Sequence, residues 1–291
     1  MPRSRIATAG YRRTRARPPG IPLVRPLFRF GRRALGKVGA APLPVRLIAG
    51  AAVILALFFA LNWLVQVIRK PAELFFPVSG TLHKAPSETW RQYGPLFRGH
   101  STAVMTPELL AALAQVEGAG NPVARTYWRW RLTWNPLELY QPASSAVGMY
   151  QITNAAFQDA RRYCIHDHAV AEDGPWNDWR SCWFNSLYTR VIPSHAIEMT
   201  SAFLDRSVAR TLARQRIAAA TFPQRQDLAA VIHLCGSGVG AVYARRGFQL
   251  TAAARCGDHD VRAYLARVNA MKRYFAWRAA AREGRGTRDE G

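Results

Sequence analysis

The hydrophobic positions of the chain form one uninterrupted apolar run and, further on, several amphipathic segments. The run covers 47–68, which carries no formal charge and has Asn62 and Gln66 as its only strongly polar residues. A helix rising about 1.5 Å per residue would span about 33 Å over this run, close to the thickness of bilayer hydrocarbon. We therefore predict a transmembrane helix at 47–68.

Beyond residue 105, apolar residues recur at helical spacing. Thr106, Pro107 and Glu108 supply an N-cap, a first-turn proline and a first-turn acid, and Gly118 is expected to end this helix just after Glu117. The same spacing predicts further helices at 153–163, 176–190, 193–214, 225–235 and 258–277. Strand-like alternation occurs only at 127–132, which indicates a short hairpin. The expected fold class is therefore mainly all-α.

The basic residues are concentrated ahead of the apolar run. The net charge is +22, and residues 1–46 hold twelve Lys and Arg side chains and no acid. Because positive segments stay on the cytoplasmic side of a membrane helix, we expect the N-terminus inside the cell and everything after residue 69 outside. A cleaved signal peptide is the alternative, but its apolar region is usually only about 7 to 15 residues long.

Composition divides the chain into five expected parts. Residues 69–104 contain scattered prolines and glycines without a clear period, as is typical of a linker. The predicted organisation is a basic disordered arm at 1–46, a signal anchor at 47–68, a linker at 69–104, one helical domain at 105–278 with an aromatic insertion near 123–143, and a disordered tail at 279–291.

All the cysteines lie beyond the apolar run, at Cys164, Cys182, Cys235 and Cys256. An even number in an oxidising compartment predicts two disulfides. Of the three possible pairings, we favour the most local one, in which Cys164 pairs with Cys182 and Cys235 with Cys256. A metal site is the alternative, because His166 and His168 follow Cys164 closely, but this spacing matches no standard zinc module. We therefore predict no metal and no cofactor.

Glu117 is the residue whose position suggests chemistry. At the C-terminal end of a helix, a carboxylate faces the negative end of the helix dipole, and burial beside aromatic residues would further disfavour its charged form. A carboxyl group that keeps its proton is suited to general acid catalysis. A single glutamate is nevertheless most often a solvated surface residue, so its neighbouring motifs decide the interpretation.

Four short segments stand in order along 105–277: EGAGNP at 117–122, SAVGMYQIT at 145–153, IHLCGSG at 232–238 and DVRAYLARV at 260–268. They resemble the motifs of the lysozyme-like lytic transglycosylases of the soluble lytic transglycosylase (SLT) domain family. Those motifs are Glu-Ser before Asn-Pro, Gly-Ala-x-Gly-Leu-Met-Gln-Ile, Ala-Tyr-Asn-Ala-Gly-x-Gly and Glu-Thr-Arg-x-Tyr-Val-x-Arg-Val. Each match is partial, and their common order gives the resemblance its weight.

The resemblance implies a lysozyme-like domain that cuts the β-1,4 bond between N-acetylmuramic acid and N-acetylglucosamine in peptidoglycan. Glu117 would protonate the leaving oxygen and then, as a carboxylate, remove the proton of the muramoyl C6 hydroxyl, which closes onto C1 as a 1,6-anhydro end. Ordinary glycosidases use a second carboxylate, which the motifs do not supply. The implied location is a periplasmic catalytic domain anchored in the inner membrane by 47–68.

The resemblance also assigns roles to the other motif positions. Tyr264 would position Glu117 through its hydroxyl group. The residues expected to contact the substrate are Gly148, Met149, Tyr150, Gln151, Gly236, Gly238 and Tyr264. The alternatives from the residues alone are a loop leading into a helix, a glycine turn and a core tyrosine.

This chain departs from the family pattern at several positions. Gly118 replaces a Ser, His233 a Tyr, Leu234 an Asn that holds the sugar, and Met149-Tyr150 a Leu-Met pair. The insertion contains Tyr127-Trp128-Arg129-Trp130-Arg131-Leu132-Thr133-Trp134. Two interpretations of this insertion stay open: it stacks on sugar rings, or it packs a flap onto the core.

Other functions stay open beside the transglycosylase. A hydrolytic muramidase is the neighbouring enzyme, and a catalytically weak wall-binding scaffold is the non-enzymatic alternative. Anchoring suggests a local role beside an envelope-spanning secretion or conjugation complex. A specific nucleic-acid partner is the least favoured, because more than half of the net charge lies in 1–46 and the rest suits an anionic wall equally well.

Overall fold

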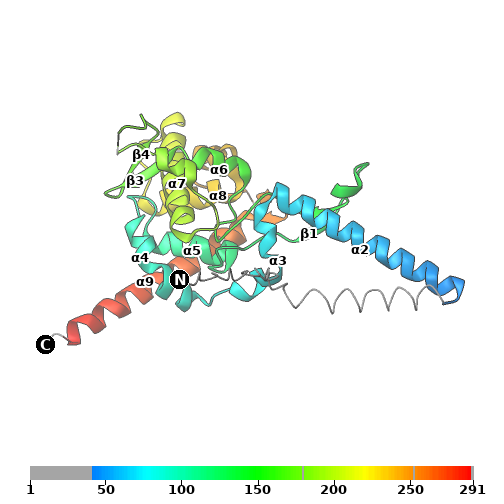
Figure 1. Cartoon of the computed structure of the whole chain (residues 1–291). Helices are drawn as coiled ribbons and strands as arrows, with labels where there is room; N and C mark the ends of the chain where they lie inside the picture. The colour runs from blue at the N-terminus through cyan, green and yellow to red at the C-terminus, as the bar shows by residue number, and fades with distance from the viewer. Residues whose placement is uncertain (1–40, 179, 252, 290–291) are drawn as a thin grey trace, which may run out of the picture. The chain divides into compact units, whose positions relative to one another are not determined.

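A computed structural model describes residues 41–178, 180–251 and 253–289 (Figure 1). Most of the arm predicted to be disordered, residues 1–40, lies outside the described residues. The described chain is mostly helical, with short antiparallel strand pairs as its β-structure, which confirms the mainly α-helical prediction.

The chain forms two compact units, one ending at Leu61 and the other beginning at Asn62. Helix α2 (Leu43–Arg69) crosses this boundary and contains the whole apolar run. Among the described residues, two helices are long and apolar enough to cross a membrane, namely α2 and α8 (Phe222–Arg245). Only 6% of the apolar window of α2 is buried, against 44% for α8, whose buried residues belong to the core. The candidate membrane helix is therefore α2.

The second unit is built around helices from both halves of the chain. Its other helices are α3 (Phe76–Ser79), α4 (Pro86–Gly99), α5 (Pro107–Gly118), α6 (Asn154–Ala160), α7 (Pro193–Arg214) and α9 (Val261–Asp289). Its 3₁₀ turns are η1 (Pro71–Phe75), η2 (Gly80–Leu82), η3 (Pro136–Glu138) and η4 (Trp183–Leu187). The antiparallel strand pairs are β1 (Trp128–Trp130) with β2 (Tyr140–Pro142), β3 (Tyr163–His166) with β4 (Ala169–Glu172), and β5 (Arg255–Cys256) with β6 (His259–Asp260).

Several predicted helices are confirmed, and others need correction. The bounds of α7 match the prediction, and α6 lies within 153–163. Helix α8 starts earlier than predicted, because Thr221 and Gln224 form a capping box, and it continues past 235 through a kink. The predicted helix at 176–190 is wrong. Among the described residues of that range only η4 is helical, and the Ser181 hydroxyl donates to the carbonyls of Pro175 and Asp178 in a turn.

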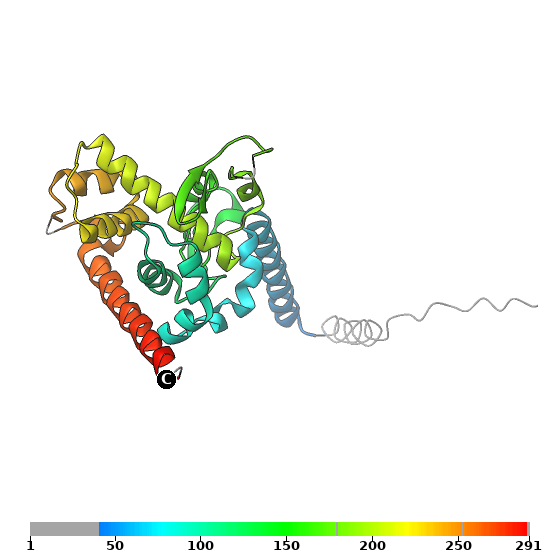
Figure 2. The ribbon, with the colours of Figure 1, turned by 90° about the vertical axis from the view of Figure 1, so that its left-hand side faces the viewer.

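The C-terminal prediction also needs correction, since α9 continues to Asp289 rather than ending near 277 before a disordered tail. Arginine and alanine dominate this extension and are favourable in helices. Figure 2 shows α9 as one long helix running along an edge of the second unit.

Helix α5 lies at the centre of the core. Six consecutive residues of α5, from Leu109 to Ala114, are at most 1% exposed, so the helix is enclosed on every side. Helices α4 and α9 both pack on α5, and Trp90 of α4 stacks on Phe275 of α9 with ring centroids 5.5 Å apart. The core therefore joins segments from the start and the end of this unit.

The prediction of a linker at 69–104 is wrong for most of that segment. Trp90, Tyr93 and Phe97 in α4 are at most 4% exposed and belong to the main core cluster. Their helical spacing was obscured by Gly94 and by Pro95, which lies inside the helix. The second unit therefore begins well before residue 105, and α4 is part of its core.

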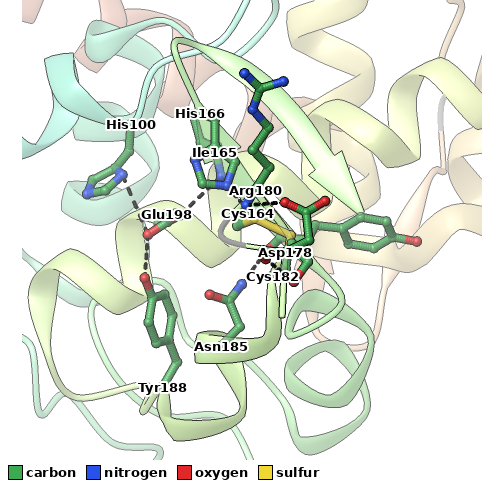
Figure 3. Close-up of a disulfide and its surroundings, with 12 residues drawn as sticks. His100, Cys164, Ile165, His166, Asp178, Arg180, Cys182, Asn185, Tyr188 and Glu198 are labelled. Carbon is green, nitrogen blue, oxygen red and sulfur yellow. Dashed lines mark hydrogen bonds and ion pairs between the residues drawn. A yellow bond between two sulfur atoms is a disulfide. The ribbon is translucent and has the colours of Figure 1, made fainter. Parts of the chain in front are cut away.

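Both predicted disulfides are confirmed, Cys164 with Cys182 and Cys235 with Cys256. Figure 3 shows the first of them, which joins β3 to the segment before η4. Because Cys164 is bonded to Cys182, its sulfur is not a thiolate ligand for a metal ion. The β3–β4 hairpin itself was missed, because only four residues pair on each side.

A buried carboxylate, Glu198 of α7, holds this disulfide region to the helical core (Figure 3). It accepts hydrogen bonds from the Ile165 backbone N–H at 3.0 Å and from the Tyr188 hydroxyl at 2.8 Å. Nδ1 of His100, at the end of α4, lies 3.7 Å from the same carboxylate. Glu198 thus connects β3, the η4 segment and the C-terminal end of α4.

The pKa shifts of two histidines beside Glu198 predict how the free energy of unfolding depends on pH. Burial lowers the pKa of His100 below its ordinary value even though Glu198 opposes this shift, and burial also lowers the pKa of His195, which stacks on Tyr188. As the pH falls below about 6.5, the unfolded chain therefore binds more protons than the folded chain. We expect stability to be fully present above that pH and to decline below it, by at most about 1.4 kcal/mol per pH unit for each histidine.

The measurement is the urea midpoint of the detergent-solubilised protein between pH 7.5 and 5.5. His100→Gln should flatten the decline, whereas His83→Gln, at an exposed histidine, should leave it unchanged. An equal pH slope in the wild type and His100→Gln would contradict the assignment.

Candidate active site

Glu117 is the last residue but one of α5, and its side chain is partly exposed although the middle of the helix is fully buried. The helix begins where the Thr106 hydroxyl accepts the Leu109 N–H at 3.3 Å and Pro107 occupies the first turn. It ends one residue later than predicted, because Gly118 is still helical and Ala119 adopts the left-handed conformation, with a φ of 49°. The Ala119 N–H bonds the carbonyl of Gln115, which satisfies the helix end.

The Glu117 carboxylate is held between two other helices. The hydroxyl group of Tyr264, from α9, donates a hydrogen bond to Oε1 of Glu117 at 2.6 Å. Nε2 of His233, from α8, lies 3.7 Å from the same oxygen. The Glu117 side chain keeps 16% of its surface exposed, so it is enclosed and still reached by solvent. The predicted contact between Tyr264 and Glu117 is thus present, while its catalytic meaning stays a prediction.

The Tyr264 phenol stays protonated over the physiological pH range and donates to Glu117. Burial raises the pKa of this tyrosine well above its ordinary value, and the nearby negative charge of Glu117 raises it further. The phenol therefore keeps its proton and directs it at Oε1. This leaves Oε2 as the oxygen of Glu117 that is not engaged by Tyr264.

His233 is the neighbour of Glu117 that sequence reasoning missed. The sequence marked it only as a departure from a family tyrosine. In the structure its ring stands edge-on to Tyr150, with centroids 6.5 Å apart, and its side chain is 12% exposed. The available signal was its place in the third motif, but only the packing of α8 against α7 and α9 brings it to the carboxylate.

A kink in α8 and the second disulfide fix this arrangement. Gly236 interrupts the helix with φ 79° and ψ 168°, a conformation that favours glycine. Cys235, just before the kink, is bonded to Cys256 in β5, a few residues ahead of α9. The disulfide therefore ties the segment carrying His233 to the segment leading to Tyr264.

A cavity of about 330 Å³ opens beside His233. Its volume lies in the usual range for small-ligand sites. The residues that line it come from the loop before α6, from α6, from α7 and from the kinked part of α8, and they include Gln151, Thr153, Asp159, Phe203, His233, Leu234 and Gly236. Asp159 is the one acidic residue among those that line this cavity, and its side chain is exposed.

Of the predicted substrate-contacting residues, Gln151 and Gly236 line the cavity, whereas Tyr264 contacts Glu117 and does not line it. The predicted cleft roles of Met149 and Tyr150 are wrong, because both are 0% exposed and Tyr150 donates its hydroxyl to the Leu110 carbonyl at 3.1 Å. Both side chains belong to the core cluster that surrounds α5, behind the site.

The remaining predicted positions are also placed. Gly148 has a φ of 83° and lies against the Arg190 carbonyl, so it serves a close backbone contact rather than the cavity. Gly238 does not line the cavity. The Gln151 amide donates to the carbonyls of Ala124 at 3.1 Å and Gly148 at 2.9 Å, which fixes its side chain at the cavity wall.

The aromatic insertion forms the predicted hairpin, in which Trp128 and Trp130 pack against Tyr140. None of its residues lines the cavity beside His233.

Neither known protein-family models nor curated proteins give a match to this chain. The interpretation of the site therefore depends on its motifs and its geometry.

The contact between Gly118 and the second motif generates a prediction. A Cβ atom added at Gly118 would lie 2.8 Å from the Met149 Cα and 2.9 Å from its carbonyl oxygen, and backbone atoms cannot move aside easily. We expect Gly118→Ser, which restores the family residue, to lower the free energy of unfolding by about 1–3 kcal/mol, as overpacking does.

Urea unfolding monitored by circular dichroism measures this loss. Gly238→Ser is the matched control, because nothing lies within 4 Å of a Cβ there. Equal stability of the two variants would contradict the close-approach explanation.

Proposed function

We propose that this protein is a lytic transglycosylase of peptidoglycan with a lysozyme-like fold, anchored in the inner membrane by α2 with its second unit in the periplasm. The observation that carries the proposal is the Glu117 carboxylate, which accepts a hydrogen bond from Tyr264 and lies 3.7 Å from His233, a residue that lines the cavity. The four ordered motifs that resemble the SLT family support the same assignment.

The geometry suits a single group that acts first as an acid and then as a base. Because Tyr264 donates to Oε1, the proton of the acid form belongs on Oε2. Glu117 gives that proton to the glycosidic oxygen as the bond to C1 of the muramoyl sugar breaks. The resulting carboxylate accepts the proton of the C6 hydroxyl while its oxygen bonds to C1, so the product is a 1,6-anhydro end and no water is consumed.

Tyr264 and His233 have distinct roles in this sequence. The Tyr264 hydrogen bond strengthens when Glu117 becomes negative, so it stabilises the charge that develops during the acid step. His233 offers a second polar group at the same oxygen and also forms part of the cavity wall. No cofactor enters the proposed reaction.

A hydrolytic muramidase is the second candidate, and Asp159 is the observation that favours it. Glycosidases that use water or a covalent intermediate need a second carboxylate, and Asp159 lines the same cavity as His233. The products separate the two enzymes, since hydrolysis leaves a reducing end. A wall-binding scaffold without activity is the third outcome, motivated by Leu234, whose apolar side chain lines the cavity where the family has an amide.

Anchoring restricts the proposed enzyme to wall close to the membrane, because the C-terminal end of α2 is bonded into the second unit. This fits a local role, such as opening the wall for an envelope-spanning secretion or conjugation complex. The proposed substrate is the peptidoglycan glycan strand.

Replacing the proposed acid gives the first activity test. Glu117→Gln keeps the shape and the Tyr264 contact but has no proton to give, so release of anhydro-muropeptides from purified peptidoglycan should stop while the urea midpoint changes little. Mass spectrometry of the released muropeptides is the measurement, with Asp159→Asn as the matched control.

Anhydro products from both the wild type and Asp159→Asn, and none from Glu117→Gln, are expected. Reducing ends that disappear in Asp159→Asn would establish the muramidase instead. Anhydro products from Glu117→Gln would place the acid elsewhere.

Removing the hydroxyl of Tyr264 gives the second activity test. A hydrogen bond to a charged group contributes about 1.5–3 kcal/mol, so Tyr264→Phe should slow cleavage roughly 10- to 100-fold. Tyr243→Phe is the control, because Tyr243 is also buried but packs against Phe248 away from Glu117. The rate and its pH profile are measured for both variants. A rate equal to the wild type in Tyr264→Phe would remove its positioning role.

A further inference from the structure

The β1–β2 hairpin presents large apolar side chains that the second unit does not bury. Trp130 is 65% exposed, Leu132 100% and Trp134 103%. Arg129 and Arg131, which alternate with them, are also exposed. A contiguous exposed set of this kind usually marks an interaction surface. Because these residues do not line the cavity beside His233, the proposed reaction does not account for them.

The hairpin is bonded directly to the last two turns of α2. The Asn62 amide donates to the Tyr140 carbonyl at 2.7 Å, and the Gln66 amide donates to the Leu137 carbonyl at 2.9 Å. Arg69 pairs with the Glu138 carboxylate at 2.8 Å. Positions 62, 66 and 69 lie on one face of a helix, so this face of α2 is a polar stripe. The two polar residues of the apolar run therefore serve to hold the hairpin.

The base of the hairpin is fixed just after α2 ends. Glu73 of η1 is 0% exposed and accepts a hydrogen bond from the Trp128 indole N–H at 2.8 Å. The same carboxylate pairs with Lys70 at 3.0 Å and with Arg125 at 3.4 Å. A buried carboxylate with several partners holds the hairpin in a defined orientation relative to residues 62–70.

These contacts indicate where the lipid hydrocarbon ends along α2. Irregular backbone exposed to lipid does not occur in the hydrocarbon region, so the hairpin carbonyls that face Asn62 and Gln66 belong at or above its boundary. Residues 43–61 then remain for the crossing, with Arg46 near the N-terminal end where its long side chain can reach the headgroups, and at about 1.5 Å per residue they span about 28 Å. This moves the predicted span from 47–68 towards the N-terminus and places the hairpin at the level of the lipid headgroups.

We propose that the β1–β2 hairpin is a lipid-interface anchor, in which Trp130, Leu132 and Trp134 enter the headgroup layer of the membrane that α2 crosses. Tryptophan is enriched at this layer, where one part of the ring is apolar and the N–H is wet. Arg129 and Arg131 are placed to reach lipid phosphates while their stems stay apolar. The anchor holds the second unit against the membrane surface. It depends on α2 entering a membrane and is independent of the reaction assigned to Glu117.

Lipid is favoured over glycan as the occupant because the surface is continuous with an apolar helix. The hairpin is attached to α2 through its own backbone carbonyls, and the neighbouring turns of α2 expose Trp63, Leu64 and Ile68. A glycan-stacking surface would be expected beside the cavity, which these residues do not line.

The test uses the full chain in lipid nanodiscs made of phosphatidylethanolamine and phosphatidylglycerol. Since all four native cysteines are in disulfides, Leu132→Cys gives a single site for a nitroxide label. Leu187→Cys, at a residue 70% exposed in η4, is the matched control. Electron paramagnetic resonance then measures collisions of each label with oxygen, which concentrates in lipid, and with a water-soluble nickel chelate.

We expect the label at 132 to favour oxygen and the label at 187 to favour nickel. Equal nickel accessibility at the two sites would overturn the proposal. A label at 132 that is accessible to nickel in nanodiscs and becomes protected only when purified glycan strands are added would assign the surface to the wall instead.

A second variant tests the attachment to α2. Asn62→Leu removes the hydrogen bond to Tyr140 and should increase nickel accessibility at position 132, whereas Leu64→Ile, on another face of the helix, should not. Muropeptide release by detergent-solubilised Asn62→Leu is expected to equal that of the wild type. Loss of activity in Glu117→Gln therefore tests the reaction, and label accessibility tests the anchor. Unchanged accessibility in Asn62→Leu would contradict the attachment.

Discussion

The enclosure of α5 is the constraint on which the rest of the second unit depends. A helix that is apolar all round is stable only if other elements cover every face, and α4 and α9 supply much of that cover. At the C-terminal end of α5, Gly118 lies so close to the Met149 backbone that no side chain would fit at this position. Glu117 is therefore presented at the edge of the core, where side chains from α8 and α9 reach it.

Two glutamates in this unit show how similar groups acquire different roles. Glu198 and Glu117 each accept a hydrogen bond from a tyrosine and lie 3.7 Å from a histidine. Glu198 also accepts a hydrogen bond from the Ile165 N–H and is almost fully buried, so its carboxylate oxygens are engaged in holding the disulfide region. Glu117 keeps part of its surface exposed and has a histidine that borders a cavity. The difference in access is what makes Glu117 the better candidate for chemistry.

The C-terminal end of α2 is bonded into the second unit. Residues 62–70 are bonded to the hairpin and to Glu73, and α4 is packed into the core a short distance further along. The end of α2, the hairpin and the core helices therefore belong to one compact unit.

The sequence by itself determined the features that depend on neighbours along the chain. The apolar run, the cap at Thr106, the bounds of α7 and the local disulfide pairs all follow from short patterns. The resemblance of the motifs singled out Glu117 and Tyr264, which the structure places within hydrogen-bond distance of each other.

Only the tertiary structure decided which side chains meet across the chain. It brought His233 to Glu117, buried Met149 and Tyr150, drew α4 into the core and gave Asn62 and Gln66 their partners in the hairpin. Each of these depends on how helices pack, and side-chain periodicity reports which face is apolar but not what covers it. The positions of α4, Met149 and Tyr150 follow from the burial of α5, because other segments of the chain must cover every face of this apolar helix.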